Sequence, residues 1–530
     1  MSDLHYCVIG SGPAGVACTR ALIERGIRVT ILDVGKSYNR ETLASIRRLQ
    51  VTPLDEWKNS EIYKELYSRR ELSETTIPKK RVFGSDFPYE DDRQLNLNQL
   101  NTKCLISHAK GGLSNVWGGA VLPFRSEDFQ EWPISLSDLI PYYEIITKEM
   151  GISGVRDDLE VMYPLYTEPQ GVFELSNQGK HILNAMQRSK KKLNAKGIYF
   201  GQSRIGVNLK EGKRSIQCCY QGVCLEGCPF FVIYNSMFSL DKLILKKECA
   251  YISNIAVSDI EEISNNKVRV NGFSENDSTQ KTFLFDKVFI ACGPIASAKI
   301  VIHTLKKYDH VFNLKYHPYF LLPLVSLNSV NNVSREKLHT LSQLFIEVVN
   351  KKISDFPLHL QLYGYNSFLE DKLDSFMLMS RSRIKHSILN RLLLLQGYLH
   401  SSEVEGIQFK IKCHSNGQTS IDMKSKRERK VNKIMRSLAL FLFFNRKSFG
   451  FWPLYPFGMI GSAGDGNHIG SLFPMKKKPR ENESDYLGRV APLKRTHIVD
   501  SSILTSLPPS TLTLTVMANA YRIGDKVPLH

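Results

Sequence analysis

Long apolar runs are absent from this sequence of 530 residues. No window offers eighteen consecutive apolar residues, and the nearest run, Leu438 to Phe444, is much too short to cross a bilayer. The first residues, MSDLHYCVIGSGPAG, also lack a basic region followed by an apolar run and a small-residue cleavage site. The sequence therefore predicts no membrane-spanning segment, and we expect a cytoplasmic protein.

Internal repeats and low-complexity tracts are also missing. With 42% hydrophobic and 23% charged residues, the chain is too apolar for disorder and long enough for two or three packed domains. Acids are the scarcer charge, because 52 Asp and Glu face 70 Lys and Arg, a formal charge of +18. Such an excess favours anionic partners or a solvated basic surface. No nucleic-acid-binding motif accompanies it, so we expect no nucleic acid partner.

The first clear motif is a strand that runs into Gly10-Ser11-Gly12-Pro13-Ala14-Gly15, with a helical pattern directly after it. In a dinucleotide-binding turn, Gly10 permits the tight turn, Gly12 lets the pyrophosphate approach, and Gly15 lets the helix lie close to its strand. A second strand ends at Asp33, about twenty residues on, where a carboxylate can bond the adenosine ribose. An acid at this position argues against NADP, so FAD and NAD remain.

A second stretch with a strand, a glycine and a helix in succession lies far along the chain. Asp286 to Leu305 reads as a buried strand, a glycine at Gly293 and a helix, as βα units do. Between His317 and Phe457 the pattern changes to strands with alternating apolar and polar residues, such as LHLQLYGY and GIQFKIKC, with few strand-to-helix connections. This pattern predicts a second domain inserted before the C-terminal segment returns to the first.

Three further stretches decide between the cofactors. HAKGGLSNVWGGAVLPF (His108 to Phe124) resembles the flavin-covering segment of the glucose–methanol–choline oxidoreductases, GNHIGSLFPM (Gly466 to Met475) their active-site histidine loop, and His497 to Val527 their closing strand, turn and helix. The motifs occur in the family's order from the first residues to the last. The chain is most similar to the sugar dehydrogenase branch of that family.

The resemblance implies an α/β fold with a Rossmann-like FAD-binding domain and an inserted α+β substrate, or cap, domain built on an antiparallel sheet. The FAD-binding domain would comprise residues 1–306 and 457–530, and the cap residues 307–456. No histidine occurs between Leu113 and Gly119, where some relatives attach FAD, so we expect non-covalent FAD. The residues expected to contact it, besides the glycine turn and Asp33, are Gly112, Ser114, Asn115, Trp117, Gly118, Gly293, Asp500 and Thr513.

The resemblance also implies oxidation of a hydroxyl group on a sugar or other alcohol, by hydride transfer to flavin N5 and onward to an unidentified electron acceptor. The hydroxyl must lose its proton as the hydride leaves, and a neutral imidazole suits that task near pH 7. His468 occupies the family's active-site loop, so we expect it to be the general base; otherwise it merely caps that loop. A flavin-fold protein kept for binding a glycan or lipid, with weak or no catalysis, is the alternative function.

One departure from the family concerns its second catalytic His or Asn, where this chain has Ser510 and Thr511. A Thr hydroxyl is a poor proton acceptor. Strand alternation places His359, Gln361 and Tyr363 on one face and pairs Tyr398 with His400. Thr511, His359 and His400 are therefore candidate catalytic residues, although the histidines could equally lie on an exposed sheet face.

Four cysteines lie within eleven residues, at Cys218, Cys219, Cys224 and Cys228. A disulfide is disfavoured in a reducing compartment. The spacing of Cys218, Cys224 and Cys228 is similar to that of the segment that binds a [3Fe-4S] cluster in sugar dehydrogenases of the family. A zinc site or plain buried thiols fit the same composition, so the three alternatives stay open.

Two segments combine basic residues with apolar runs, Ser380 to Leu399 and Lys424 to Trp452. Basic amphipathic segments can lie on an anionic membrane surface. They can equally be cap helices that pack their apolar faces inward. A peripheral membrane contact, with an anionic or lipid-linked saccharide as substrate, is therefore a weaker hypothesis.

Overall fold

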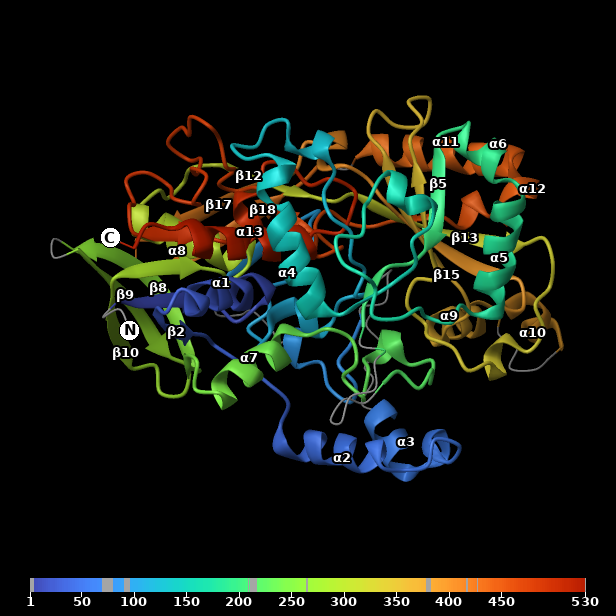
Figure 1. The fold of residues 1–530 in the computed structure, drawn as a ribbon, viewed down its shortest axis with the longest axis horizontal. Helices are drawn as coiled ribbons and strands as arrows, with labels where there is room; N and C mark the ends of the chain where they lie inside the picture. The colour runs from blue at the N-terminus through green and yellow to red at the C-terminus, as the bar shows by residue number, and fades with distance from the viewer. Residues whose placement is uncertain are drawn as a thin grey trace.

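The computed structural model describes residues 4–68, 80–89, 96–207, 209, 217–263, 266–377, 383–415, 418–426 and 428–529. Figure 1 shows two regions along the long axis of the molecule. A parallel sheet with its helices lies near the two chain ends, and a larger antiparallel sheet lies at the opposite end. Among the described helices, none is both long and apolar enough to cross a membrane.

The parallel sheet has the strand order β22-β11-β1-β2-β7. Its strands are β1 (His5–Ile9), β2 (Arg28–Leu32), β7 (Ala250–Ile252), β11 (Lys287–Ile290) and β22 (Thr496–Ile498). The predicted βα units are confirmed, because β1 leads into α1 (Pro13–Glu24) and β11 into α8 (Pro294–Leu305). The C-terminal helix α13 (Thr513–Lys526) packs on α1 so closely that a Cβ on Gly524 would lie 3.0 Å from the Ala21 Cβ.

The larger sheet has seven strands in the order β19-β13-β16-β15-β14-β5, with β20 also paired to β13. They are β5 (Ile198–Gln202), β13 (Tyr319–Ser326), β14 (Leu344–Val348), β15 (Leu358–Tyr363), β16 (Leu392–Tyr398), β19 (Phe451–Pro453) and β20 (Met459–Ile460). Helices α5 (Asn177–Arg188) and α11 (Arg429–Phe444) share one apolar core with this sheet. The predicted Rossmann-like domain with an antiparallel cap is therefore confirmed.

A mixed five-stranded sheet joins the two regions, in the order β21-β12-β17-β18-β3. It contains β3 (Leu97–Leu100), β12 (Phe312–Tyr316), β17 (Ile407–Cys413), β18 (Thr419–Lys424) and β21 (Ile469–Gly470). The pairing of β21 with β12 fixes the loop that carries His468 against the start of the cap.

The remaining elements surround these sheets. An antiparallel three-stranded sheet contains β8 (Ile255–Ile263), β9 (Lys267–Ser274) and β10 (Gln280–Phe285). A short two-stranded sheet pairs β4 (Ile152–Ser153) with β6 (Ile205–Gly206). The helices are α2 (Arg40–Gln50), α3 (Glu61–Ser68), α4 (Ile140–Met150), α6 (Lys190–Asn194), α7 (Ser236–Leu245), α9 (Ser367–Met377), α10 (Arg383–Leu389) and α12 (Arg446–Phe449).

The structure differs from the sequence prediction in two places. The cap extends beyond residues 307–456, because β5 is an edge strand of its sheet although it lies more than a hundred residues earlier. The leucine-rich run expected to be helical is the strand β16, which pairs with β13 and β15. The basic part before it includes α10, while residues 380–382 lie outside the described ranges.

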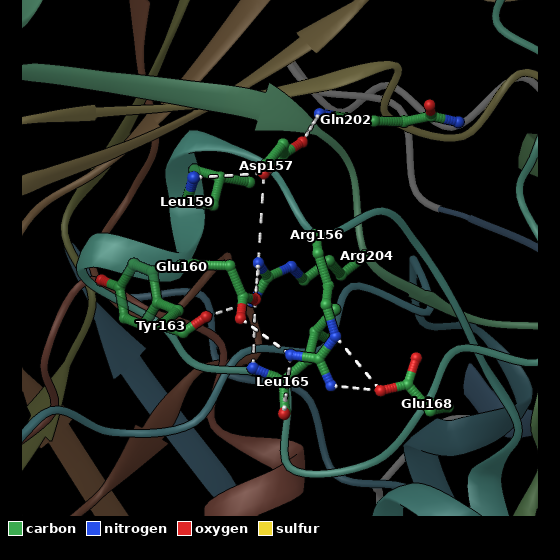
Figure 2. Close-up of polar contacts among 9 residues, drawn as sticks. All are labelled: Arg156, Asp157, Leu159, Glu160, Tyr163, Leu165, Glu168, Gln202 and Arg204. Atoms are coloured by element: carbon green, nitrogen blue, oxygen red, sulfur yellow. Dashed lines mark hydrogen bonds and ion pairs between the residues drawn. The ribbon is translucent and has the colours of Figure 1, made fainter.

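A buried arginine connects the loop around η7 (Asp158–Val161) to the segment that follows β5 (Figure 2). The Arg204 side chain is 1% exposed and donates to Glu160 Oε1 at 2.6 Å and to the Tyr163 carbonyl. Arg156, on the outer side of Glu160, also donates to Glu168 Oε1 at 2.6 Å. The backbone carbonyl of Arg204 accepts from Val121 N at 2.9 Å. This network therefore ties the end of β5 to the segment predicted to cover the flavin.

Candidate active site

The glycine turn has the geometry of a dinucleotide-binding loop. Gly10 has φ +95°, and a Cβ there would lie 2.7 Å from the Ala291 carbonyl oxygen. A Cβ on Gly15 would lie 2.0 Å from the Gly10 carbonyl oxygen, so helix and strand need both glycines. Gly12, the N-cap of α1, has open space where a Cβ would be. Since the N–H groups of a helix N-terminus attract anions, this space fits a phosphate.

Asp33 lies one residue after β2, beside this turn. Its Oδ2 accepts from the hydroxyl of Ser11, which belongs to the turn, and from Tyr251 Oη at 3.1 Å. Burial raises the pKa of this carboxyl to about 6. A carboxylate held at the carboxyl end of β2 has the placement expected of a ribose ligand.

The segment after His108 lies directly on the glycine turn. A Cβ on Gly112 would lie 3.4 Å from Gly12 Cα, and Gly111 N donates to Ser11 Oγ at 2.9 Å. Ser114 donates to the Gly111 carbonyl at 2.6 Å, and Asn115 donates to the Gly112 carbonyl at 2.7 Å. These bonds fold the segment back onto itself against the turn.

The end of the same segment is held by its neighbours. Trp117 Nε1 donates to the Tyr234 carbonyl at 2.7 Å. A Cβ on Gly118 would lie 3.9 Å from the Lys80 Nζ atom. The side chains of Ser114, Asn115 and Trp117 thus hold the protein chain itself, which leaves backbone atoms to face a cofactor.

The closing segment meets the same edge of the sheet. Asp500, buried at the end of β22, accepts from Gly293 N at 2.9 Å and from Ser297 Oγ, so it joins β22 to the start of α8. Thr513 is the first residue of α13. The predicted cofactor residues after β1, β2, β11 and β22 therefore converge at the carboxyl ends of parallel strands, where open α/β sheets bind their ligands.

His468 lies beside this edge, one residue before β21. The Ser501 hydroxyl donates to the Ile469 carbonyl at 2.9 Å, which fixes the histidine loop to the segment after Asp500. His468 is half-buried, and this burial lowers the pKa of its imidazole to about 4. The imidazole is therefore neutral at pH 7.

A second histidine, which the sequence reasoning missed, contacts His468. His317, between β12 and β13, is 1% exposed, and its Nδ1 lies 3.1 Å from His468 Nδ1. Its backbone N–H donates to the His468 carbonyl at 3.0 Å. Burial lowers the pKa of His317 well below its usual value, and the Pro508 carbonyl opposes this in part. The available signal was a histidine between two apolar strand patterns in NLKYHPYFLLPL.

His359, Gln361 and Tyr363 share one face, as strand alternation predicted. Gln361 Nε2 lies 3.0 Å from His359 Nε2 and Tyr363 donates to Gln361 Oε1 at 2.7 Å. The face is interior, since His359 is 0% exposed and its Nδ1 lies 2.6 Å from Glu347 Oε1. The alternative of an exposed sheet face is therefore wrong for these residues.

The Tyr398 ring separates this buried face from His468. Its centroid lies 6.2 Å from that of His359 and 5.3 Å from that of His468, with the rings stacked in both cases. Of the predicted pair Tyr398 and His400, only Tyr398 reaches His468. His400 stacks on Phe356 at 4.1 Å and its Nδ1 accepts from Ser402 N at 3.0 Å, so it caps a turn.

The Thr511 side chain hydrogen-bonds to the protein backbone and not to His468. Its Oγ1 accepts from Leu122 N at 2.8 Å, and its side chain is buried. The neighbouring Ser510 hydroxyl is buried with no partner in the described part of the chain. The prediction of Thr511 and His400 as catalytic residues therefore gains no support from their contacts.

The cysteine segment forms a partly buried cluster with apolar neighbours, in which Cys218, Cys224 and Cys228 all take part. Burial raises the pKa of Cys218, and that of Cys228 to about 12. Over the described ranges, no three His, Cys, Asp or Glu side chains are placed to hold a metal ion, and the cysteines are free. The described geometry thus shows neither the predicted iron–sulfur site nor the alternative zinc site.

No protein-family model matches the chain. Two solved structures have the same fold: pyridoxine 4-oxidase from Mesorbium loti, with TM-score 0.58 and 11% identity over 98% of both chains, and a formate oxidase variant from Aspergillus oryzae RIB40, with TM-score 0.59 and 12% identity over 99% of this chain and 98% of the oxidase. Both are glucose–methanol–choline oxidoreductases, so the predicted resemblance is confirmed at the level of the fold.

Two curated proteins are similar over part of the sequence. A 2-methyl-1,2-propanediol dehydrogenase of Mycolicibacterium austroafricanum is 26% identical over 176 residues, which are 31% of this chain and 26% of the dehydrogenase. A 6'''-hydroxyparomomycin C oxidase of Streptomyces lividus is 26% identical over 160 residues, which are 28% of this chain and 23% of the oxidase. The match therefore spans about a quarter of the length of each relative.

Proposed function

We propose that this chain is an FAD-dependent oxidoreductase of the glucose–methanol–choline type that oxidises a hydroxyl group of a sugar or another alcohol. The observation that carries the proposal is the His468 loop, which brings a neutral imidazole to the edge of the sheet where the cofactor residues converge. The fold of the two solved oxidases supports it. So does the dehydrogenase activity on a diol that the name of one relative prints.

The residues at the glycine turn fit non-covalent FAD. The open space at Gly12 and the N-terminus of α1 would hold the pyrophosphate, and Asp33 the adenosine ribose. The segment from Gly112 to Gly118 and the start of α13 at Thr513 would enclose the flavin end. When bound, FAD supplies the acceptor for the hydride that leaves the alcohol carbon.

His468 acts as the general base that removes the hydroxyl proton. Its neutral state at pH 7 leaves one ring nitrogen free to accept a proton. The adjacent His317 decides which nitrogen this is. In the tautomer that carries the His317 proton on Nε2, His317 Nδ1 accepts from His468 Nδ1 and leaves His468 Nε2 as the base.

The tyrosine rings beside His468 support a substrate rich in hydroxyl groups. Tyr398 stacks on His468, and Tyr319, whose hydroxyl donates to Asp465 Oδ2 at 3.3 Å, lies on the neighbouring strand with its ring 6.0 Å from that of Tyr398. Phenol and imidazole groups offer both apolar ring faces and hydrogen bonds, as polyols require.

The cofactor and the activity have direct tests. Protein that is denatured should release FAD into the supernatant, and a panel of sugars, diols and other alcohols should bleach the flavin absorbance without oxygen. His468→Ala should keep its FAD content and lose about a hundredfold or more in turnover. Release of NAD, or of no nucleotide, would refute the cofactor. A flavin that no alcohol bleaches would favour a flavin-fold protein that only binds a glycan or lipid.

The electron acceptor is a separate question, and no electron path through Cys218, Cys224 and Cys228 is part of this proposal. The predicted [3Fe-4S] cluster stays a prediction for iron and sulfide analysis of anaerobically purified protein. Stoichiometric iron that disappears in Cys224→Ser would show that these thiols rearrange around a metal, whereas metal-free protein with full activity would leave them as core thiols.

A further inference from the structure

The outward face of α11 is unusual in composition. Its inward face, with Leu438 and Leu442 fully buried, packs into the cap core, so the hypothesis of a cap helix is confirmed for that face. The opposite face begins with exposed basic side chains and continues with exposed apolar ones. The basic residues are Arg429, Lys433 and Arg436, and the apolar ones are Leu440, Phe443 and Phe444, which are 51%, 37% and 75% exposed.

These residues form one stripe because they follow helical spacing. Positions 429, 433, 436, 440, 443 and 444 are three or four residues apart, or adjacent at the end, and therefore share one side of the helix. Figure 1 places α11 near the edge of the molecule, at the end where α6 and α12 also lie. Since each of these side chains is exposed, the stripe is an uncovered face of the described part of the structure.

The stripe continues onto the edge strand of the sheet. Trp452 in β19 is 42% exposed and its ring lies 5.7 Å from that of Phe443, edge to face. The Arg446 guanidinium lies over both rings, 5.0 Å from Phe443 and 5.1 Å from Trp452. An arginine stacked between two exposed aromatic rings gives the surface an apolar area with a fixed positive charge.

The charge on this face is of one sign. No acidic residue occurs from Arg429 to Gly450. Lys430, beside the stripe, pairs with Glu403 at 2.6 Å. Among the ion pairs formed by described residues, none uses Lys433, Arg436 or Lys447. These cations are thus available to an anionic partner.

We propose that this face of α11, with Trp452, docks on an anionic bilayer surface. Exposed Phe, Leu and Trp side chains between Lys and Arg are the combination by which helices lie in a membrane interface, with the rings among the acyl chains and the cations at the headgroups. A second copy of the chain is a poor occupant, since a symmetric dimer would place the same cations against one another. A bilayer instead offers both an apolar phase and negative charge.

Vesicle flotation of the full chain tests the proposal. The protein should float with vesicles of phosphatidylcholine and phosphatidylglycerol at 70:30 and at least tenfold less with phosphatidylcholine alone, and 0.5 M salt should release most of it. Leu440→Ser with Phe444→Ser should lose at least tenfold of the binding, and so should Lys433→Gln with Arg436→Gln. Leu245→Ser, an 82% exposed apolar residue on a different helix, is the matched control and should bind as the wild type does.

Several outcomes would overturn the proposal. They are equal flotation with neutral and anionic vesicles, full binding by both stripe variants, and no flotation at all. Self-association in sedimentation that the Leu440 and Phe444 changes abolish would assign the face to a second copy. Binding to a DNA duplex that the charge changes abolish, while the apolar changes do not, would assign it to nucleic acid. Unchanged thermal midpoints keep lost binding distinct from lost folding.

Discussion

The Nδ1 atoms of His317 and His468 lie 3.1 Å apart, although 151 positions separate the two residues in the sequence. Pairing of β12 with β21 brings the two loops together, and a backbone bond from His317 N to the His468 carbonyl fixes them. The chain has Ser510 and Thr511 where related oxidoreductases are expected to carry a second His or Asn. A partner for the proposed base therefore comes from the start of the cap.

Replacing His317 should lower the rate without weakening substrate binding. His317→Phe removes the group that orients His468, and we expect a fall in kcat of about tenfold to a hundredfold, part of the factor that a positioned base contributes. KM should stay near the wild-type value, because the buried His317 is not placed to touch substrate. Steady-state kinetics with FAD-loaded protein measure both. His317→Asn, which keeps a hydrogen-bonding side chain, should recover most of the rate; equal loss in both variants would contradict an orienting role.

Two glycines of the same turn should respond differently to alanine. Gly12 has open space for a Cβ, so Gly12→Ala should fold normally but lose FAD, because the methyl group fills the space proposed for the phosphate. Gly15→Ala would place its Cβ 2.0 Å from the Gly10 carbonyl oxygen, so it should lower the thermal midpoint of the cofactor-free protein as well. Absorbance at the flavin band and thermal unfolding without cofactor separate the two effects. Normal FAD content in Gly12→Ala would place the pyrophosphate elsewhere.

The sequence predicted the parts of the fold that depend on local pattern. The glycine turn, Asp33 and the βα unit after β11 were readable because each is a contiguous strand, turn and helix. Neither the entry of β5 into the cap sheet nor the meeting of His317 with His468 could be read in this way, since strand pairing over long separations leaves no local mark. The leucine-rich β16 was mistaken for a helix because a short apolar run fits a buried strand equally well.

Acid should destabilise the protein between pH 6.5 and about 4. Burial lowers the pKa of His339, His468 and His497 to about 4 each. An unfolded histidine titrates near pH 6.5, so the unfolded chain takes up protons first as the pH falls. The stability that these neutral rings contribute is present above pH 6.5 and is lost toward pH 4. Urea midpoints of cofactor-free protein at pH 7.0, 5.5 and 4.5 should fall in that order, and His497→Gln should flatten the trend. A constant midpoint would contradict the prediction, because it would mean that these histidines have the same pKa in the folded and the unfolded chain.

The last prediction concerns the buried pair of Glu347 and His359, whose side chains are both 0% exposed with 2.6 Å between Oε1 and Nδ1. Removing either partner leaves the facing atom of the other, His359 Nδ1 or Glu347 Oε1, buried without this hydrogen bond, which costs about 1 to 3 kcal/mol or more where the remaining group is charged. Glu347→Leu and His359→Phe should therefore each destabilise the cap, while the double variant should lose less than the sum, since neither polar group then remains. Urea unfolding of the three variants gives the coupling energy. Because Tyr398 stacks on both His359 and His468, the single variants should also lower turnover through a displaced ring. Strict additivity of the two changes would show that the pair contributes no mutual stabilisation.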